Sequence, residues 1–253
     1  MRSAILLLSM TLVALPLVPD EPIRWLAGVN LHKAWTLAIL LAGISFLGYL
    51  AVKLGGEKRG LLLANASASM LGGPARGLAA GALVAGAVSC LRTVVLVLLV
   101  APQIARLLWP ALVAAAIAMT ATAMVLSLRG TAQEESPTPP ANPFELGAVL
   151  RMAALLVGVG ALAKLGAEWL GGAAVIIIAA VTGLTDVDAI TLSMPQLVPD
   201  VITATLAARA IAVAVASNII AKAAYAAALG NRAYGRLYGI GSLVALGAVL
   251  TAR

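Results

Sequence analysis

The stretch 183–195 constrains the fold more than any other part of the chain, because it places two carboxylates inside sequence typical of a lipid-buried segment. Asp186 and Asp188 lie between two runs rich in Ala, Val, Ile and Leu within the span 172–198. That span is long enough to cross a bilayer, and the two acids fall near its middle. Charge at such depth is costly, so these residues usually face a bundle interior or a wet cavity. The stretch predicts a polar site inside a membrane protein.

The residues around the two acids predict a break in the helix. Gly183 permits the chain to leave helical geometry, and Thr185 is the expected N-cap of a new half-helix. Asp188 follows at capping-box spacing, and Pro195 ends or kinks the half-helix. A discontinuous transmembrane helix is the device by which transporters present backbone ends and side chains near the bilayer midplane.

A structural interpretation of the two acids stays open beside the functional one. Either carboxylate can simply cap a helix, where the positive end of the helix dipole stabilises it. For Asp188, the cap and a ligand role are equally good interpretations. Since acids at i and i+2 point in different directions, only one of them is needed as a cap, which favours a functional role for Asp186.

Composition places the chain in the membrane. Hydrophobic residues make up 62% and charged residues 11% of its 253 positions, which excludes a soluble globular domain of ordinary composition. The net charge of +7 contains no basic cluster longer than Lys58-Arg59, so it predicts topology-setting charges rather than nucleic-acid binding. Cys90 and His32 are each the only residue of their type, which argues against a disulfide framework, a zinc enzyme or Ser-His catalysis. We expect no enzymatic activity.

The predicted fold is an all-α polytopic membrane protein with about eight helical spans plus short or broken helices. The domain boundaries follow from the hydrophilic stretch 129–145, which is rich in Pro, Ser, Thr and Glu. They are 1–34 for a first transmembrane helix and loop, 35–128 for a first membrane repeat, 129–145 for the linker, and 146–253 for a second repeat carrying the Asp-Val-Asp motif. The unbroken spans are expected at 1–18, 35–54, 78–100, 107–128, 146–165, 203–229 and 234–250.

The short apolar segment 60–71 carries Asn65, Ser67 and Ser69 at alternate positions. It is too short for a straight crossing, so we expect a short or re-entrant helix lined with polar side chains. An amphipathic surface helix is an equally good interpretation. If the segment crosses, the distribution of Lys and Arg predicts a cytoplasmic N-terminus. The expected location is an inner membrane of bacterial type.

The two halves resemble one another, which predicts an internal two-fold repeat. Ala-Val-Ser-Cys-Leu-Arg92 matches Val-Ala-Ser-Asn-Ile-Ile-Ala-Lys222, and Asn218 shares a helix face with Lys222. Arg92 or Lys222 can then neutralise Asp186 or Asp188. We expect Lys222 to form a structural pair, whereas Arg92 can instead extend its guanidinium to an interface.

Three segments carry a family resemblance over nearly the whole chain: Asn-Pro-Phe-Glu-Leu146, Glu168-Trp169 and above all Gly183-Leu-Thr-Asp-Val-Asp-Ala-Ile-Thr-Leu-Ser193. The sequence resembles the DUF4010 family, membrane proteins associated with the MgtC/SapB group. The family has no assigned function, and the resemblance implies a connection to magnesium or other cation homeostasis.

Two hypotheses follow. In the first, the chain is a small ion or solute transporter or channel-like protein that binds a proton or a cation such as Mg²⁺ and needs no other cofactor. Asp186 and Asp188 are its candidate metal ligands, and the charge partners are Arg92, Lys222 and Asn218. The remaining candidate ion-binding residues are Thr185, Thr191, Ser193, Asn65, Ser67 and Ser69. In the second, the chain is a non-transporting membrane regulator or assembly subunit whose buried charges fix helix packing. The expected partners are the lipid bilayer and a second copy or another membrane protein.

Overall fold

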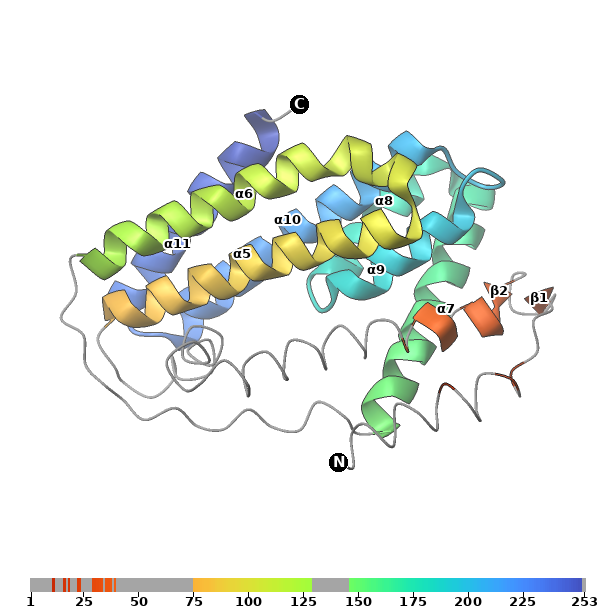
Figure 1. Cartoon of the computed structure of the whole chain (residues 1–253), viewed down its shortest axis with the longest axis horizontal. Helices are drawn as coiled ribbons and strands as arrows, with labels where there is room; N and C mark the ends of the chain where they lie inside the picture. Colours follow the sequence, from red (N-terminus) through yellow and green to blue (C-terminus); the bar gives the residue numbers. More distant parts are fainter. Residues whose placement is uncertain are drawn as a thin grey trace.

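A computed structural model describes residues 75–128 and 146–251, together with separate positions between 11 and 39. The predicted spans 1–18 and 35–54, the short segment 60–71 and the linker 129–145 lie wholly or mostly outside the described residues. Among the described N-terminal positions, β1 (Pro22–Ile23) pairs antiparallel with β2 (Val29–Asn30). Each of these strands has two residues. The two long described ranges, 75–128 and 146–251, form helices joined by short connections (Figure 1).

The first described helices, α5 (Ala75–Val100) and α6 (Pro102–Leu128), form an antiparallel hairpin (Figure 1). Ala101 alone separates them, and its amide donates to the carbonyl of Val97 at 2.8 Å. Pro102 suits the first position of α6 because that amide would have no intrahelical partner. Leu83, Leu112 and Ala115 are fully buried in the core, so the hairpin packs through apolar side chains of mixed size.

The second range contains α7 (Leu146–Leu170), the short α8 (Gly172–Gly183) and α9 (Val187–Ser193), and the 3₁₀ turn η3 (Met194–Leu197). It ends with α10 (Ala204–Leu229) and α11 (Arg232–Thr251). Helix α10 contacts α6, α8, α9 and α11, and α11 also packs on α5 and α6. Helix α9 contacts α5, α7 and α10, and all of its residues are buried. The centre of this bundle is therefore a short helix that meets elements from both sides of the linker.

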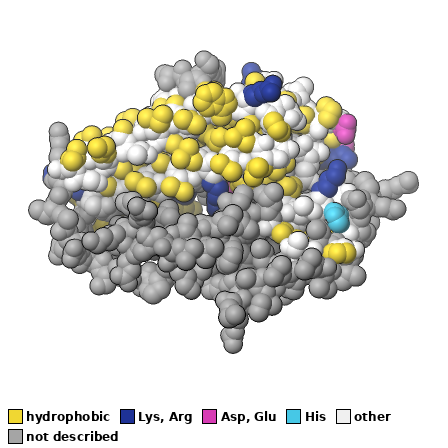
Figure 2. All heavy atoms as spheres, viewed as in Figure 1, with side chains coloured by type: hydrophobic (Ala, Val, Ile, Leu, Met, Phe, Trp, Pro, Cys, Tyr) yellow, Lys and Arg dark blue, Asp and Glu magenta, His cyan; other side chains and the backbone are white. Residues whose placement is uncertain are grey.

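Four of these helices are long and apolar enough to cross a membrane: Ala75–Val100, Pro102–Leu128, Ala153–Leu170 and Ala204–Leu229. Large apolar side chains remain exposed on them, including Leu99, Ile117, Trp169 and Leu229. Figure 2 shows such side chains spread along the visible face with few charges among them. An apolar exterior of this kind suits lipid rather than water. The chain is a membrane protein of apolar helices.

The spans expected at 78–100, 107–128, 146–165 and 203–229 correspond to these four helices, with boundaries that differ by a few residues at several ends. The expected last span, 234–250, is helical as part of α11, but α11 is not among the four candidate spans. The broken element at 172–198 is resolved into α8, α9 and η3, and α8 has 12 residues. At 1.5 Å per residue, α8 is about 18 Å long and too short to cross a bilayer alone. The total of about eight spans and the internal repeat stay predictions.

Candidate functional site

The helix break predicted at the Asp-Val-Asp motif is present between α8 and α9. Helix α8 ends at Gly183, and the chain turns with the amide of Asp186 donating to the carbonyl of Thr182 at 2.8 Å. Asp186 then adopts extended geometry, with φ −151° and ψ 124°, and α9 begins at Val187. At the other end, α9 passes directly into the 3₁₀ turn that contains Pro195, as expected for a residue that cannot continue the helical hydrogen bonding.

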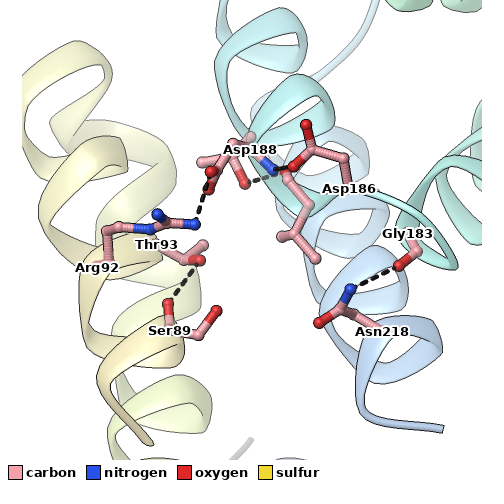
Figure 3. Close-up of polar contacts among 9 residues, drawn as sticks. Ser89, Arg92, Thr93, Gly183, Asp186, Asp188 and Asn218 are labelled. Atoms are coloured by element: carbon pink, nitrogen blue, oxygen red, sulfur yellow. Dashed lines mark hydrogen bonds and ion pairs between the residues drawn. The ribbon is translucent and has the colours of Figure 1, made fainter. Parts of the chain in front are cut away.

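Asp186 is the N-cap of α9, and the prediction that Thr185 is the cap is wrong. The Asp186 Oδ1 atom accepts a hydrogen bond from the amide of Asp188 at 2.8 Å (Figure 3). Thr185 is exposed, and its hydroxyl donates to the carbonyl of Thr182 at 3.0 Å. Both residues are good caps, and the tight turn after Gly183 places the helix start one residue later than predicted. Asp186 therefore has a structural role as a helix cap, whereas the sequence favoured a functional role for it.

Asp188 faces α5 and meets Arg92 there (Figure 3). The Arg92 Nη2 atom donates to Asp188 Oδ2 at 2.6 Å, across 96 positions of sequence. The Asp188 side chain is 8% exposed and that of Arg92 is 36% exposed. Such a short contact between charged groups is a strong, charge-assisted hydrogen bond. Of the charge pairings that the sequence leaves open, the structure contains this one, and Arg92 is directed into the bundle.

The Arg92–Asp188 contact leaves polar atoms unsatisfied. Asp188 Oδ1 and Arg92 Nε are both buried, and neither has a hydrogen-bond partner among the described residues. Buried polar atoms are normally paired, so an unpaired carboxylate oxygen at a helix break is the kind of atom that takes up a proton, a water or an ion. Among the described residues of the break, this pair is the one that has buried polar atoms without a partner.

Asn218 lies on α10 opposite the end of α8. Its Nδ2 atom donates to the carbonyl oxygen of Gly183 at 3.0 Å (Figure 3). The sequence predicts Asn218 as a charge partner, and the structure places it instead on a backbone carbonyl freed by the helix break. This bond satisfies a group that the end of α8 would otherwise leave without an intrahelical partner.

Gly183 has a different role from the one predicted. It does not adopt the left-handed geometry that favours glycine, because among the described residues only Gly171 has positive φ. A Cβ atom at position 183 would lie 2.3 Å from the carbonyl oxygen of Ala214 and 2.6 Å from its Cα. Glycine is needed here because α8 and α10 approach each other backbone to backbone.

The hydroxyls of Thr191 and Ser193 are occupied by backbone contacts. Thr191 Oγ1 donates to Val187 of its own helix at 2.8 Å, and Ser193 Oγ donates to Leu156 on α7 at 3.1 Å. Both residues are buried. The Ser193 bond fixes α9 against α7, so this hydroxyl is directed away from the Asp188 side of the helix. Neither hydroxyl bonds to the Arg92–Asp188 pair, and Asn65, Ser67 and Ser69 lie outside the described residues.

Lys222 makes no hydrogen bond or ion pair with the residues that the structure describes, so the structural pair expected for it is absent there. Instead Lys222 lines two neighbouring cavities between α5, α10 and α11. The smaller one, with a volume of about 10 Å³, also touches Val187 at the start of α9. A volume of this order holds roughly one water molecule. Its other lining residues are Gly86, Ser89, Cys90, Thr93, Met119, Val215, Asn218, Ile219 and Tyr238.

Sequence reasoning missed three residues of this region. Thr93 is buried beside Arg92, and its hydroxyl donates to the carbonyl of Ser89 at 3.1 Å. Tyr234 and Tyr238 stack with ring centroids 6.0 Å apart on α11. In the sequence, Thr93 could have been found because it follows the arginine of an apolar helix. The two tyrosines could have been found from their i, i+4 spacing in a chain with 4% aromatic residues.

The two aspartates do not form a metal site with other described ligands. In residues 75–128, 146–251 and the described N-terminal positions, no three His, Cys, Asp or Glu side chains gather to hold a metal ion. One oxygen of each aspartate already accepts a hydrogen bond: that of Asp186 from the Asp188 amide, and that of Asp188 from Arg92. Any ion at Asp188 must therefore displace Arg92 or share the carboxylate with it.

Comparison with known proteins agrees with the resemblance seen in the sequence. The family model described as "Domain of unknown function (DUF4010)" matches residues 39–230, a range that contains the whole of α5 to α10 and both partners of the ion pair. No curated protein and no solved structure matches the chain. Because the family model covers well over half of the sequence, the chain belongs to the DUF4010 family.

Proposed function

We propose that the chain is a small ion or solute transporter, or a channel-like protein, in which Asp188 exchanges Arg92 for a proton or cation. The single observation that carries this proposal is the incompletely satisfied ion pair at a helix break. Asp188 keeps one oxygen paired with Arg92 and one buried oxygen without a described partner. Charges inside membrane helices are rare and usually mark ion pathways or proton relays.

The exchange follows from electrostatics. In the structure, Arg92 neutralises Asp188, so the pair has no net charge and little affinity for a cation. When a proton or cation binds Asp188, Arg92 loses its partner and is repelled by a bound cation. Because Arg92 is 36% exposed whereas Asp188 is nearly buried, the arginine is the partner that can leave. The pair is then the unloaded state of a cycle.

The cation preference needs the carboxylate. A half-helix N-terminus is positive and by itself favours anions. At the start of α9, Asp186 caps that end and Asp188 stands in the first turn, so the local sign is reversed by two acids. The proposal therefore assigns the cation or proton to Asp188 and the maintenance of α9 to Asp186.

The test separates the two aspartates in purified protein reconstituted into liposomes. Proton and Mg²⁺ entry would be followed with entrapped fluorescent indicators under imposed gradients. We expect Asp188→Asn to abolish the entry of protons and Mg²⁺. The matched control is Asp186→Asn, which keeps a capping side chain and should retain most of the flux. Unchanged flux in folded Asp188→Asn protein would overturn the mechanism.

A second candidate function is supported by the pairing itself. Asp186 caps α9 and Asp188 is bonded to Arg92, so both acids already have structural tasks. This arrangement fits a non-transporting regulator or assembly subunit whose charges fix helix packing. For such a protein, Asp188→Asn lowers the yield of folded protein or of a complex, while wild-type liposomes show no flux above empty ones.

Several wider assignments belong to the same proposal. We infer a relation to MgtC/SapB-type proteins and a link to magnesium or other cation homeostasis from the resemblance alone. An inner membrane of bacterial type with a cytoplasmic N-terminus, the lack of enzymatic activity, and association with a second copy or another membrane protein are likewise proposed. Accessibility labelling of single cysteines in intact cells would test the orientation.

A further inference from the structure

We propose that the larger cavity beside Lys222 is a binding site for a small organic anion, a monocarboxylate carried on a short apolar or aromatic body. This proposal names the class of solute that the proposed transporter would carry. Only the transport of that solute rests on the proposed function. Binding is a separate property of the cavity, with its own test.

The cavity has the size and walls of a small-molecule site. Its volume is about 280 Å³, near the lower end of the range of about 300–1,000 Å³ typical of ligand pockets. Helices α5, α10 and α11 supply its lining, which is mostly alanine, glycine, leucine and tyrosine. The polar side chains in this lining are those of Lys222, Tyr225, Tyr234 and Tyr238.

Lys222 sets the sign of the ligand. Among the described residues that line this cavity, Lys222 alone carries a formal charge at neutral pH, and no described carboxylate forms an ion pair with it. Lys222 is exposed, so a ligand can reach its ammonium group, and beside these apolar walls that group attracts an anion and repels a cation. The nearby cation Arg92 is already neutralised by Asp188.

The tyrosines set the shape of the ligand. Tyr234 and Tyr238 are 7% and 3% exposed, and their rings stack. Tyr225 is 58% exposed. Aromatic faces favour a flat apolar body, and phenol groups can donate hydrogen bonds to a carboxylate. A charged head on a compact apolar or aromatic body fits this combination better than a bare inorganic ion does.

Basic side chains near this cavity add a favourable field. The lining residues Leu229 and Gly230 place the cavity at the connection between α10 and α11, where Arg232 and Arg236 are both exposed. Every described acid belongs to the segment 146–203 and none lines the cavity; they are Glu168, Asp186, Asp188 and Asp200. Basic residues near an opening raise the local concentration of anions.

The position of Lys222 couples this cavity to the ion pair. Lys222, Gly86 and Tyr238 line both cavities, and the smaller cavity reaches Val187 at the start of α9. An anion held at Lys222 would therefore lie one small cavity away from Val187, the first residue of α9. An anion there would also offset the positive charge of Arg92 when Asp188 is protonated, so a carboxylate and a proton would be favoured together.

The experiment measures binding of benzoate by isothermal titration calorimetry to protein in nanodiscs of zwitterionic lipid. Benzamide, a neutral molecule of the same shape, is the control ligand. We expect saturable benzoate binding and a dissociation constant for benzamide at least about tenfold higher. Lys222→Gln should weaken benzoate binding by at least about tenfold, and Lys222→Arg should retain it. Equal affinity for the two ligands, or unchanged affinity in Lys222→Gln, would overturn the proposal.

The variant Asp188→Asn separates this inference from the proposed function. It lies outside the larger cavity, so benzoate binding should persist while proton-coupled flux is lost. Benzoate binding without flux in the wild-type protein refutes the transport function and leaves the anion site intact. Flux of Mg²⁺ or protons without saturable benzoate binding refutes the anion site and leaves transport intact.

Discussion

The side-chain amide of Asn218 on α10 donates to the carbonyl oxygen of Gly183, the last residue of α8, at 3.0 Å. We predict that Asn218→Leu destabilises the protein, because a buried carbonyl loses its partner at a cost of about 1–3 kcal/mol. Thermal unfolding in a mild detergent would measure the change. Ser127→Ala is the control, since the Ser127 hydroxyl bonds to Ala123 of its own helix at 2.9 Å. An equal loss of stability in both variants would contradict the assigned role of Asn218.

Gly183→Ala should severely damage the packing of α8 on α10. The added Cβ atom would lie 2.3 Å from the Ala214 carbonyl oxygen, so the two helices would have to separate. We expect a large loss of folded protein on size-exclusion chromatography. Gly158→Ala on α7 is the matched control, because its Cβ atom meets nothing within 4 Å. That change should be neutral or stabilise the helix by roughly 0.5–1 kcal/mol. Normal yield of Gly183→Ala would show that the two backbones can move apart cheaply.

The capping role of Asp186 predicts a graded series at that position. Asp186→Asn retains an oxygen that can accept from the Asp188 amide, so stability should be close to wild type. Asp186→Ala removes the cap and should cost about 0.5–2 kcal/mol. Unfolding midpoints of the three proteins at one detergent concentration would give the order. If Asn and Ala destabilise equally, the charge of Asp186 rather than its cap stabilises the break.

The ion pair between Arg92 and Asp188 predicts a non-additive double-mutant cycle. Arg92→Gln leaves a buried carboxylate without its cation, and loss of one partner of a buried pair costs about 3–5 kcal/mol, with less expected here because Arg92 is 36% exposed. Asp188→Asn relieves that burden, so the double variant should be more stable than Arg92→Gln alone. Unfolding measurements on all four proteins would give the coupling free energy. Additive effects would show that the two side chains do not interact in solution.

The sequence was sufficient to predict the helical membrane fold and the position of the helix break. Long apolar runs predicted the four described spans, because few other structures satisfy backbone groups in lipid. Gly183 and the Asp-Val-Asp motif located the break, since carboxylates are costly within a lipid-facing helix. The charge pair between Arg92 and Asp188 was among the combinations expected, but pattern alone could not choose it over Lys222.

The details that the sequence could not determine depend on register and distance. Thr185 and Asp186 are both good caps, and one residue of turn geometry decides between them. The need for glycine at 183 comes from Ala214, which is distant in sequence, so no local pattern contains it. The cavity beside Lys222 needs three helices to be placed together. Helical periodicity grouped Lys222 with Asn218 on one face of α10, but it could not bring the tyrosines of α11 to that face.

The close contact between Gly183 and Ala214 has a consequence for motion. Without a side chain between them, and with Asn218 bonded to the Gly183 carbonyl, the end of α8 and the middle of α10 must move as one rigid body. Helix α9 is tied to α7 through Ser193 and Leu156. A displacement of one pair of helices relative to the other would have to bend three connections: Gly171, residues 184–186 and residues 198–203. Of these connections, residues 184–186 end at the cap of α9, so any such bend there would move the Asp186 carboxylate.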